Sequence, residues 1–257
     1  MIYNFHTRTA RCGHASGTPE EYIKRAIEGG IKYMGFSDHM PYICTDGYES
    51  GYRVPVKEAK EYVMEISLLR EKYKGEIDIK IGFEMEYYPK HFKKMLESAI
   101  EYGAEYLILG AHFTEEEHPG GIHMIETDSV EKFKEYALCV CEGIKSGVFT
   151  YVAHPDLCYF TNDDAVYDEE MRKICVTARE FNIPLEINFL GIRSGRNYPD
   201  ERFWKIAGEE QSPVTFGFDS HDVLSAYDGD SLETAEKLIE KYKLNYIGMP
   251  EIKLIGK

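Results

Sequence analysis

The residues of this chain best suited to metal chemistry are imidazoles and carboxylates that follow short apolar runs. Five of the nine histidines stand at or just beyond the end of such a run: His6, His39, His112, His154 and His221. Glu84 and Asp219 occupy equivalent positions. Neutral imidazole binds Zn, Mn and Fe, and a carboxylate can bridge two ions. One histidine at a strand end is usually a hydrogen-bonded structural residue, but five of them with two carboxylates predict a metal cluster.

The segment HTRTARCGH, residues 6–14, adds His14 and raises a question about Arg8. Two imidazoles and a guanidinium in one short stretch fit either the rim of a metal site or an ordinary polar loop. The local sequence leaves both interpretations open. The remaining histidines, at positions 91, 118 and 123, do not follow apolar runs, and we expect them at the surface or in loops.

Apolar runs and helical segments alternate along the chain. Strand-like runs occupy residues 2–5, 32–37, 78–83, 106–110, 149–153, 185–189 and 214–218. Segments of helical period lie between them, at 19–30, 56–73, 90–102, 129–147, 168–182 and 231–242. This alternation is typical of parallel βαβ units. So many units favour a closed α/β barrel, although a doubly wound sheet also fits the pattern.

The position of the chemical residues follows from that alternation. The C-terminal ends of the strands of a parallel barrel share one face, which carries the active site. The histidines and carboxylates would therefore converge on one pocket. The longest loops, 47–55 and 114–128, also follow strands, and we expect them to line it.

Composition excludes several classes of protein. A formal net charge of −15 argues against nucleic-acid binding, which needs clustered Lys and Arg. No run of about 18 apolar residues predicts a membrane span, and the N-terminus lacks the apolar core of a signal peptide. The six cysteines form no CxxC pair, which indicates reduced thiols and a cytoplasmic location. Residues 1–257 are predicted to form one domain, and nothing in the sequence indicates an oligomeric state.

With these residues in place, the chain resembles the polymerase and histidinol phosphatase (PHP) family of metal-dependent phosphoesterases, most closely its histidinol-phosphate phosphatase branch. The resemblance covers essentially the whole chain, and its motifs occur in the family's order. They are HTRTARCGHA (6–15), GFSDH (35–39), GFEMEY (82–87), GAH (110–112), AHPD (153–156), NFLGIRSGRNYP (188–199) and FDSH (218–221). Each motif is weak alone, but the ordered set is specific.

The resemblance implies a distorted (β/α)7 TIM-like barrel with two to three divalent ions, Zn, Mn or Fe, at the C-terminal face of the strands. It implies three ligand sets: Glu84, His112 and His154 for one ion; His14, His39 and His221 for a second; His6, Glu84 and Asp219 for a third. The implied reaction is hydrolysis of a small phosphorylated substrate, L-histidinol phosphate, to L-histidinol and phosphate, a step of histidine biosynthesis.

Arg8 departs from the family pattern, in which this position is a histidine ligand. A guanidinium stays protonated and offers only donors, so it cannot ligate a metal in the usual way. Either one ion is absent or weakly held, with Arg8 supplying the missing charge and gripping the substrate phosphate, or the site is damaged. We favour the first interpretation because the other ligand positions are intact.

The remaining roles concern the phosphate and the leaving group. Arg193 is the candidate phosphate clamp, with Arg8 and Arg196 as weaker candidates. Asp219 or His221 would pass a proton to the leaving oxygen. Asp38 either orients an imidazole or is simply a polar strand-end residue.

Two alternatives to histidinol phosphate hydrolysis remain open. One is a PHP phosphoesterase for another phosphomonoester. The other is a catalytically weak protein that binds metal and a phosphorylated ligand, and Arg8 is its only support.

Overall fold

A computed structural model describes residues 1–117 and 123–256 of the chain. The strands that form the barrel or flank it are β1 (Tyr3–Asn4), β2 (Tyr33–His39), β3 (Asp78–Glu86), β4 (Tyr106–Gly110), β7 (Leu185–Asn188), β8 (Pro213–Gly217) and β9 (Asn245–Tyr246). The helices are α1 (Pro19–Glu28), α2 (Ala59–Lys72), α3 (Phe92–Tyr102), α4 (Val130–Lys145), α5 (Asp164–Phe181), α6 (Phe189–Ser194), α7 (Glu201–Glu210) and α8 (Gly229–Tyr242). A small ribbon, β5 (Glu126–Thr127) with β6 (Tyr159–Phe160), lies apart from these strands.

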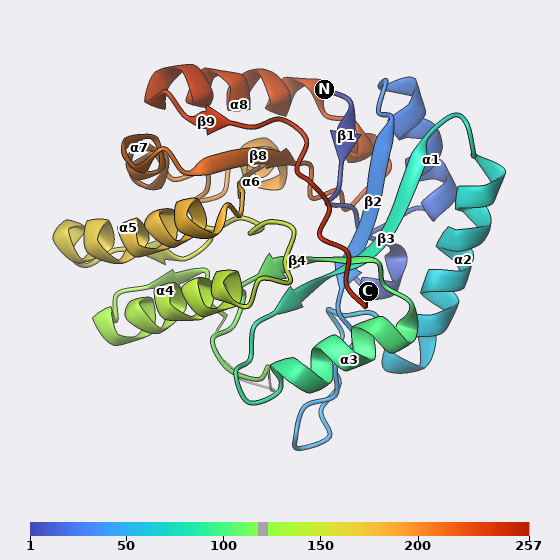
Figure 1. Ribbon diagram of the computed structural model, residues 1–257, viewed down its shortest axis with the longest axis horizontal. Helices are drawn as coiled ribbons and strands as arrows, with labels where there is room; N and C mark the ends of the chain where they lie inside the picture. Colours follow the sequence, from blue (N-terminus) through green and yellow to red (C-terminus); the bar gives the residue numbers. More distant parts are fainter. Residues whose placement is uncertain (118–122, 257) are drawn as a thin grey trace.

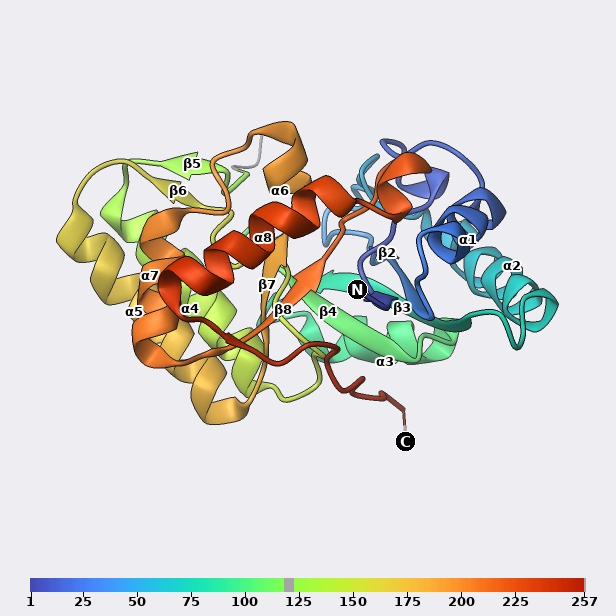
Figure 2. The same cartoon turned by 90° about the horizontal axis from the view of Figure 1, so that it is seen from above.

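The strands form a curled parallel sheet with the helices outside it (Figures 1 and 2). Parallel pairing runs β1-β2-β3-β4 and then continues through Val152, which bridges Leu109 on one side and Leu185 on the other. β7 pairs with β8, and the Thr7–Ser220 bridge joins the segment after β8 to the segment after β1. The predicted distorted (β/α)7 barrel is thereby confirmed.

Two details of the elements differ from expectation. The predicted strand 149–153 forms a regular bridge only at Val152, although Thr150 and Ala153 also donate hydrogen bonds to the β4 backbone. Helices α6 and α7 were not expected. α7 is short and contains Gly208, where a Cβ would lie 2.1 Å from the Tyr242 carbonyl oxygen of α8. The glycine that weakens the helical signal is thus required for packing.

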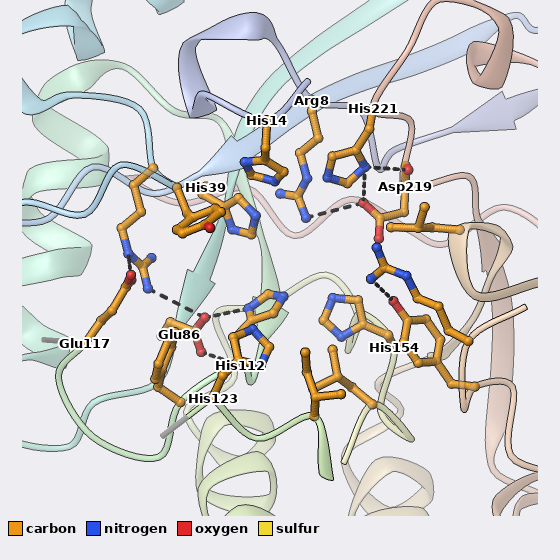
Figure 3. A pocket seen from close by; sticks show the side chains of 18 of the residues that line it. Arg8, His14, His39, Glu86, His112, Glu117, His123, His154, Asp219 and His221 are labelled. Carbon is orange, nitrogen blue, oxygen red and sulfur yellow. Dashed lines mark hydrogen bonds and ion pairs between the residues drawn. The ribbon is translucent and has the colours of Figure 1, made fainter. Parts of the chain in front are cut away.

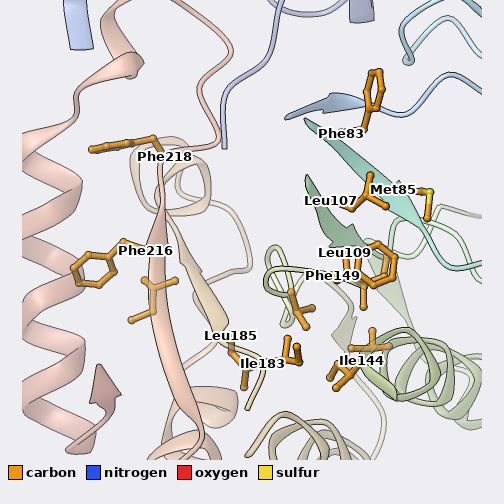
Figure 4. Packing of buried hydrophobic residues seen from close by; sticks show 14 of the residues in the cluster. Phe83, Met85, Leu107, Leu109, Ile144, Phe149, Ile183, Leu185, Phe216 and Phe218 are labelled. Atoms are coloured by element: carbon orange, nitrogen blue, oxygen red, sulfur yellow. The ribbon is translucent and has the colours of Figure 1, made fainter. Parts of the chain in front are cut away.

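The core has two layers. Between strands and helices lies a large apolar layer that includes Phe83, Leu109 and Phe216 (Figure 4). A smaller second cluster is rich in aromatic rings: Tyr3, Phe5, Tyr106, Ile108, Tyr151 and Ala153. Gly35 and Gly82 make room for the Tyr106 side chain. A Cβ at position 35 would lie 2.1 Å from the Tyr106 hydroxyl, and a Cβ at position 82 would lie 2.5 Å from the Tyr106 ring.

The two ends of the barrel differ. Beyond β9 the chain crosses the N-terminal ends of the strands, where Ile255 N donates to Glu105 O and Lys253 N donates to the Thr150 hydroxyl (Figure 1). The C-terminal ends carry long loops and a cavity. No helix of residues 1–117 and 123–256 is long and apolar enough to cross a membrane.

Candidate metal centre

The predicted ligands converge at the C-terminal ends of the strands, as parallel topology requires. They border or underlie a cavity of about 940 Å³, around which the imidazoles turn toward one another (Figure 3). His39 ends β2, Glu84 lies within β3, and His112 follows β4. The others come from segments after β1, Val152 and β8: His6, His14, His154, Asp219 and His221.

Glu84 lies at the centre of the group. Its Oε1 is 2.9 Å from His154 Nε2 and 3.9 Å from His112 Nε2, and its Oε2 is 3.0 Å from His39 Nδ1. Burial alone would favour the protonated acid, but Arg8, His112 and His39 hold the pKa of Glu84 well below its usual range. The carboxylate is therefore ionised and reaches three imidazoles.

Four imidazoles are oriented by an acceptor at Nδ1. His6 donates to Glu186 Oε1 and His112 to Glu86 Oε1, both at 2.7 Å. His14 and His221 donate to main-chain oxygens, those of Cys12 at 2.8 Å and Asp219 at 3.0 Å. Each bond places the ring proton on Nδ1 and leaves Nε2 as an acceptor, which is how proteins prepare imidazole for a metal; in His6 that acceptor faces Arg8 Nη2 at 3.0 Å.

Several buried atoms of the site lack a hydrogen-bond partner within the described part of the chain. They are Glu84 Oε1, Asp219 Oδ1 and both ring nitrogens of His154. The short Glu84–His154 contact is an ion-pair distance without hydrogen-bond geometry. Unpaired buried acceptors are costly unless a cation satisfies them. The donor set of carboxylate and imidazole therefore fits a borderline divalent ion.

Ligand atoms gather closely in two triads, His6–Glu84–His154 and His39–Glu84–His112. Within each triad these atoms lie within 4.8 Å of one another. A third group forms above them, because the His14 ring centroid is 5.4 Å from that of His39 and 4.9 Å from that of His221. The site thus offers groups of residues that can hold metal ions.

Two ligand positions have left-handed backbone, with φ of 30° at His154 and 47° at Asp219. Such strain persists only where neighbours enforce it. Glu186 Oε2 accepts a hydrogen bond from His154 N at 3.0 Å, and Arg193 Nη2 donates to Asp219 O at 2.5 Å. Glu186 and Arg193 therefore hold the backbone that presents these ligands.

These contacts correct the role expected of Arg193. Its other terminal nitrogen donates to Phe218 O at 2.6 Å, and Arg193 is not among the residues lining the cavity. Its guanidinium anchors the chain after β8 and does not clamp phosphate. Arg196, by contrast, does line the cavity, beside Tyr198.

Arg8 is buried at the floor of the cavity, with 1% of its surface exposed. Its Nη2 donates to Glu84 Oε2 at 2.5 Å and lies 3.0 Å from His6 Nε2, while Nη1 donates to Ser37 O at 3.0 Å. Both terminal nitrogens are therefore occupied. These contacts do not favour the expected bidentate grip of Arg8 on a substrate phosphate.

His91 and His123 lie outside helices and strands, as expected. His123 also lines the cavity, with its ring 5.6 Å from that of His112, whereas His91 lies outside it near Glu116. His118 falls outside the described residues. Asp38 accepts hydrogen bonds from Thr9 and from the His39 backbone N, so it does not orient an imidazole.

The loops expected to line the site do so, through residues on both: Tyr52, Arg53, Glu117, His123 and Ile125. Sequence reasoning missed Glu186 and Glu86, the carboxylates that orient His6 and His112. Their signal was a charged residue within the apolar strands LEIN and DIKIGFEME, where a buried carboxylate requires a partner.

Fold and site together define a (β/α)7 barrel with a metal-binding centre of imidazoles and carboxylates. A family model, the PHP domain, matches residues 4–189, most of the chain. The chain therefore belongs to the PHP domain family, as its motifs indicated.

Relatives and solved structures agree with this assignment. The chain is 27% identical to a probable histidinol-phosphatase of Deinococcus radiodurans over 225 residues, 84% of this chain and 85% of that protein. It is 25% identical to the histidinol-phosphatase of Bacillus subtilis, covering 87% of this chain and 96% of that one. The fold matches a histidinol phosphate phosphatase of Lactococcus lactis, solved with zinc, L-histidinol and phosphate, with a TM-score of 0.72, 20% identity, and coverage of 100% and 99%.

Proposed function

We propose that this protein is a metal-dependent phosphomonoesterase that hydrolyses L-histidinol phosphate to L-histidinol and phosphate. The observation that carries the proposal is the convergence of imidazoles and ionised carboxylates, several with unpaired acceptors, at the floor of one cavity. The names of the relatives and the L-histidinol and phosphate of the L. lactis structure support the choice of substrate.

We infer that two of the implied ligand sets hold metal ions, supported by the approach of His112 and His154 to Glu84 and of the His14 ring to those of His39 and His221. Glu84, His112 and His154 would hold one ion, and a cluster of three imidazoles would hold the other: His14, His39 and His221. Zn, Mn or Fe suits these donors. When bound, two such ions would neutralise the phosphate dianion and lower the pKa of a water molecule, so that its deprotonated form is available to attack phosphorus.

The residues of the chain position the remaining groups. Arg196 lines the cavity and offers a guanidinium to the phosphate oxygens. Asp219 also lines the cavity, and its Oδ1 has no hydrogen-bond partner among the described residues. We assign Asp219 to receive the proton of the attacking water and to return it to the leaving oxygen. His221 is less suited, because its Nδ1 proton is directed at a main-chain carbonyl and its Nε2 is assigned to an ion.

The walls of the cavity suit a small molecule with an aromatic ring. Apolar and aromatic side chains form much of its surface: Tyr52, Phe113, Leu157, Leu190 and Tyr198. A pocket that is mostly apolar, with a few convergent polar groups, is typical of small-molecule sites. The imidazole ring of histidinol phosphate can pack against these side chains while the phosphate group of the same molecule reaches the metal centre.

The whole chain contributes to this unit. The family model ends at residue 189, but β8, Asp219 and His221 lie beyond it and complete the barrel and the site. We therefore propose that residues 1–257 form one PHP-type domain.

The test is phosphate release by purified protein loaded with Mn²⁺ or Zn²⁺, measured on histidinol phosphate and a panel of other phosphomonoesters. We expect kcat/KM above about 10⁴ M⁻¹s⁻¹ for histidinol phosphate. His112→Gln should lower it by at least 100-fold, about the largest effect of losing a group that only orients a ligand. His91→Gln, the same change outside the cavity, should not.

Each other result has a defined meaning. Preference for another ester would keep the chemistry and replace the substrate. Inactivity on the whole panel, with metal bound, would reject the enzyme in favour of a metal- and phosphate-binding protein.

A further inference from the structure

The Arg8 side chain lies among the three residues that the family resemblance assigns to the third ion. Its Nη2 is 2.5 Å from Glu84 Oε2, 3.0 Å from His6 Nε2 and 3.4 Å from Asp219 Oδ1. His6 donates its Nδ1 proton to Glu186, so its Nε2 is an acceptor facing the guanidinium. One nitrogen of Arg8 thus faces all three groups that would surround a metal ion.

The third ligand set therefore does not fit a metal ion in this chain. An ion bound by imidazole and carboxylate needs each ligand atom at about 2.0–2.2 Å. Nη2 already occupies the space between the three acceptors, and its two hydrogens are directed at Glu84 Oε2 and His6 Nε2, while Asp219 Oδ1 lies 3.4 Å away as an ion pair. A divalent ion there would also meet a fixed positive charge at contact distance, which disfavours binding.

Arg8 is held in this position from both ends. Its Nη1 donates to Ser37 O at 3.0 Å and its backbone N donates to Ser220 O at 3.0 Å. The side chain is 1% exposed, and the neighbouring carboxylates outweigh burial and raise the pKa of Arg8 above its ordinary value. Moving the guanidinium away would leave Glu84 and Asp219 buried without the fixed positive charge of Arg8.

We propose that the Arg8 guanidinium permanently takes the place of the divalent ion at the His6–Glu84–Asp219 site, so that this protein holds two ions and one built-in cation. The proposal concerns the metal centre of the proposed phosphatase but does not depend on which substrate it hydrolyses. Unlike the charge of a bound metal ion, the charge of Arg8 cannot be removed by a chelator.

The count of bound ions tests the proposal directly. Wild-type protein and variants are stripped with a chelator, saturated with Zn²⁺, dialysed to equilibrium, and analysed for metal per chain by mass spectrometry. We expect no more than two ions in the wild type and one additional ion in Arg8→His. Arg53→His is the matched control: Arg53 is also buried and lines the same cavity, but pairs with Glu117 and Glu86, which belong to none of the three ligand sets, so the count should not rise.

A crystal structure of the Zn²⁺-loaded wild type, with zinc located by anomalous scattering, gives an answer even if Arg8→His fails to fold. Zinc at the other two ligand sets, with Arg8 still against Glu84, is the expected result. Three ions in the wild type, zinc within bonding distance of His6, or an unchanged count in folded Arg8→His would overturn the proposal. None of these readouts requires phosphatase activity, so an incorrect substrate assignment would leave them unaffected.

Discussion

Replacing Glu186 by glutamine tests whether the buried carboxylate behind the metal centre prepares its ligands. Glu186 is fully buried and accepts three hydrogen bonds: from His6 Nδ1 at 2.7 Å, His154 N at 3.0 Å and Asn188 Nδ2 at 2.8 Å. All three partners are donors. Glutamine has nearly the same shape but offers one oxygen and one NH₂ group, so an NH₂ must face a donor in at least one direction.

The size of the effect follows from this mismatch. If the NH₂ faces His154 and Asn188, buried donors lose their acceptor, which costs about 1–3 kcal/mol. If it faces His6, that ring must move its proton to Nε2 and can no longer accept from Arg8. A loss of about 2 kcal/mol lowers the melting temperature of a chain of this size by about 4–8 °C. Changes at groups that orient ligands also lower metal affinity by about 10–100-fold.

Two measurements check this prediction: thermal unfolding of metal-free protein, and Zn²⁺ affinity by competition with a chromophoric chelator. Glu170→Gln provides the matched control, because Glu170 is also a buried carboxylate but, among residues 1–117 and 123–256, pairs only with Lys173 on α5. We expect the control to keep wild-type Zn²⁺ affinity. A Glu186→Gln protein with wild-type melting temperature and Zn²⁺ affinity would refute the role we give this carboxylate.

Four further predictions test other contacts of the site and the barrel. Gly217→Ala should reproduce the loss of Zn²⁺ affinity expected for Glu186→Gln without changing a polar group, because a Cβ at position 217 would lie 1.6 Å from Glu186 Oε1. Combining the two changes should lower the affinity little further, and full additivity of their effects would argue against the mechanism. Arg196→Ala should raise KM for the phosphoester by about 10-fold, the equivalent of about 1.4 kcal/mol, at unchanged melting temperature. Arg193→Ala should instead lower the melting temperature, because the left-handed turn after β8 loses its anchor; a KM effect alone would contradict this division. Trp204→Phe should lower the free energy of unfolding by about 1–3 kcal/mol, measured by urea unfolding followed by circular dichroism, because the indole N–H of Trp204 donates to the buried Asp156. An unchanged urea midpoint would disprove the contribution of that bond.

The sequence predicts the convergence of the candidate ligands because their placement depends on strand topology. A residue at the C-terminal end of a parallel strand reaches the same face whatever the details of packing, so His39, His112 and His221 converge as expected. Glu186 was missed for the opposite reason. Its role depends on which side chains of other strands face it, and local sequence does not contain that information.

The two arginines of GIRSGR show the same limit at closer range. Arg193 and Arg196 are three residues apart, and spacing alone does not tell which one faces the cavity. Helix α6 ends at Ser194, and Gly195 follows in the left-handed conformation with φ of 61°. The chain turns there, so Arg193 lies against the backbone after β8 while Arg196 reaches the cavity.

The charge at the floor of the barrel explains why arginine is compatible with a position that the family gives to a metal ligand. Burial would favour neutral carboxyls, yet Arg8 and nearby imidazoles keep the pKa of both Glu84 and Asp219 well below the usual range. Two unpaired buried carboxylates would cost several kcal/mol each. A guanidinium neutralises part of that charge with directed hydrogen bonds and also reaches Ser37 O, which the single ammonium of a lysine cannot match in the same geometry. Arg8 therefore stabilises the floor of the site before any metal binds, whereas a histidine would do so only after its ion had arrived.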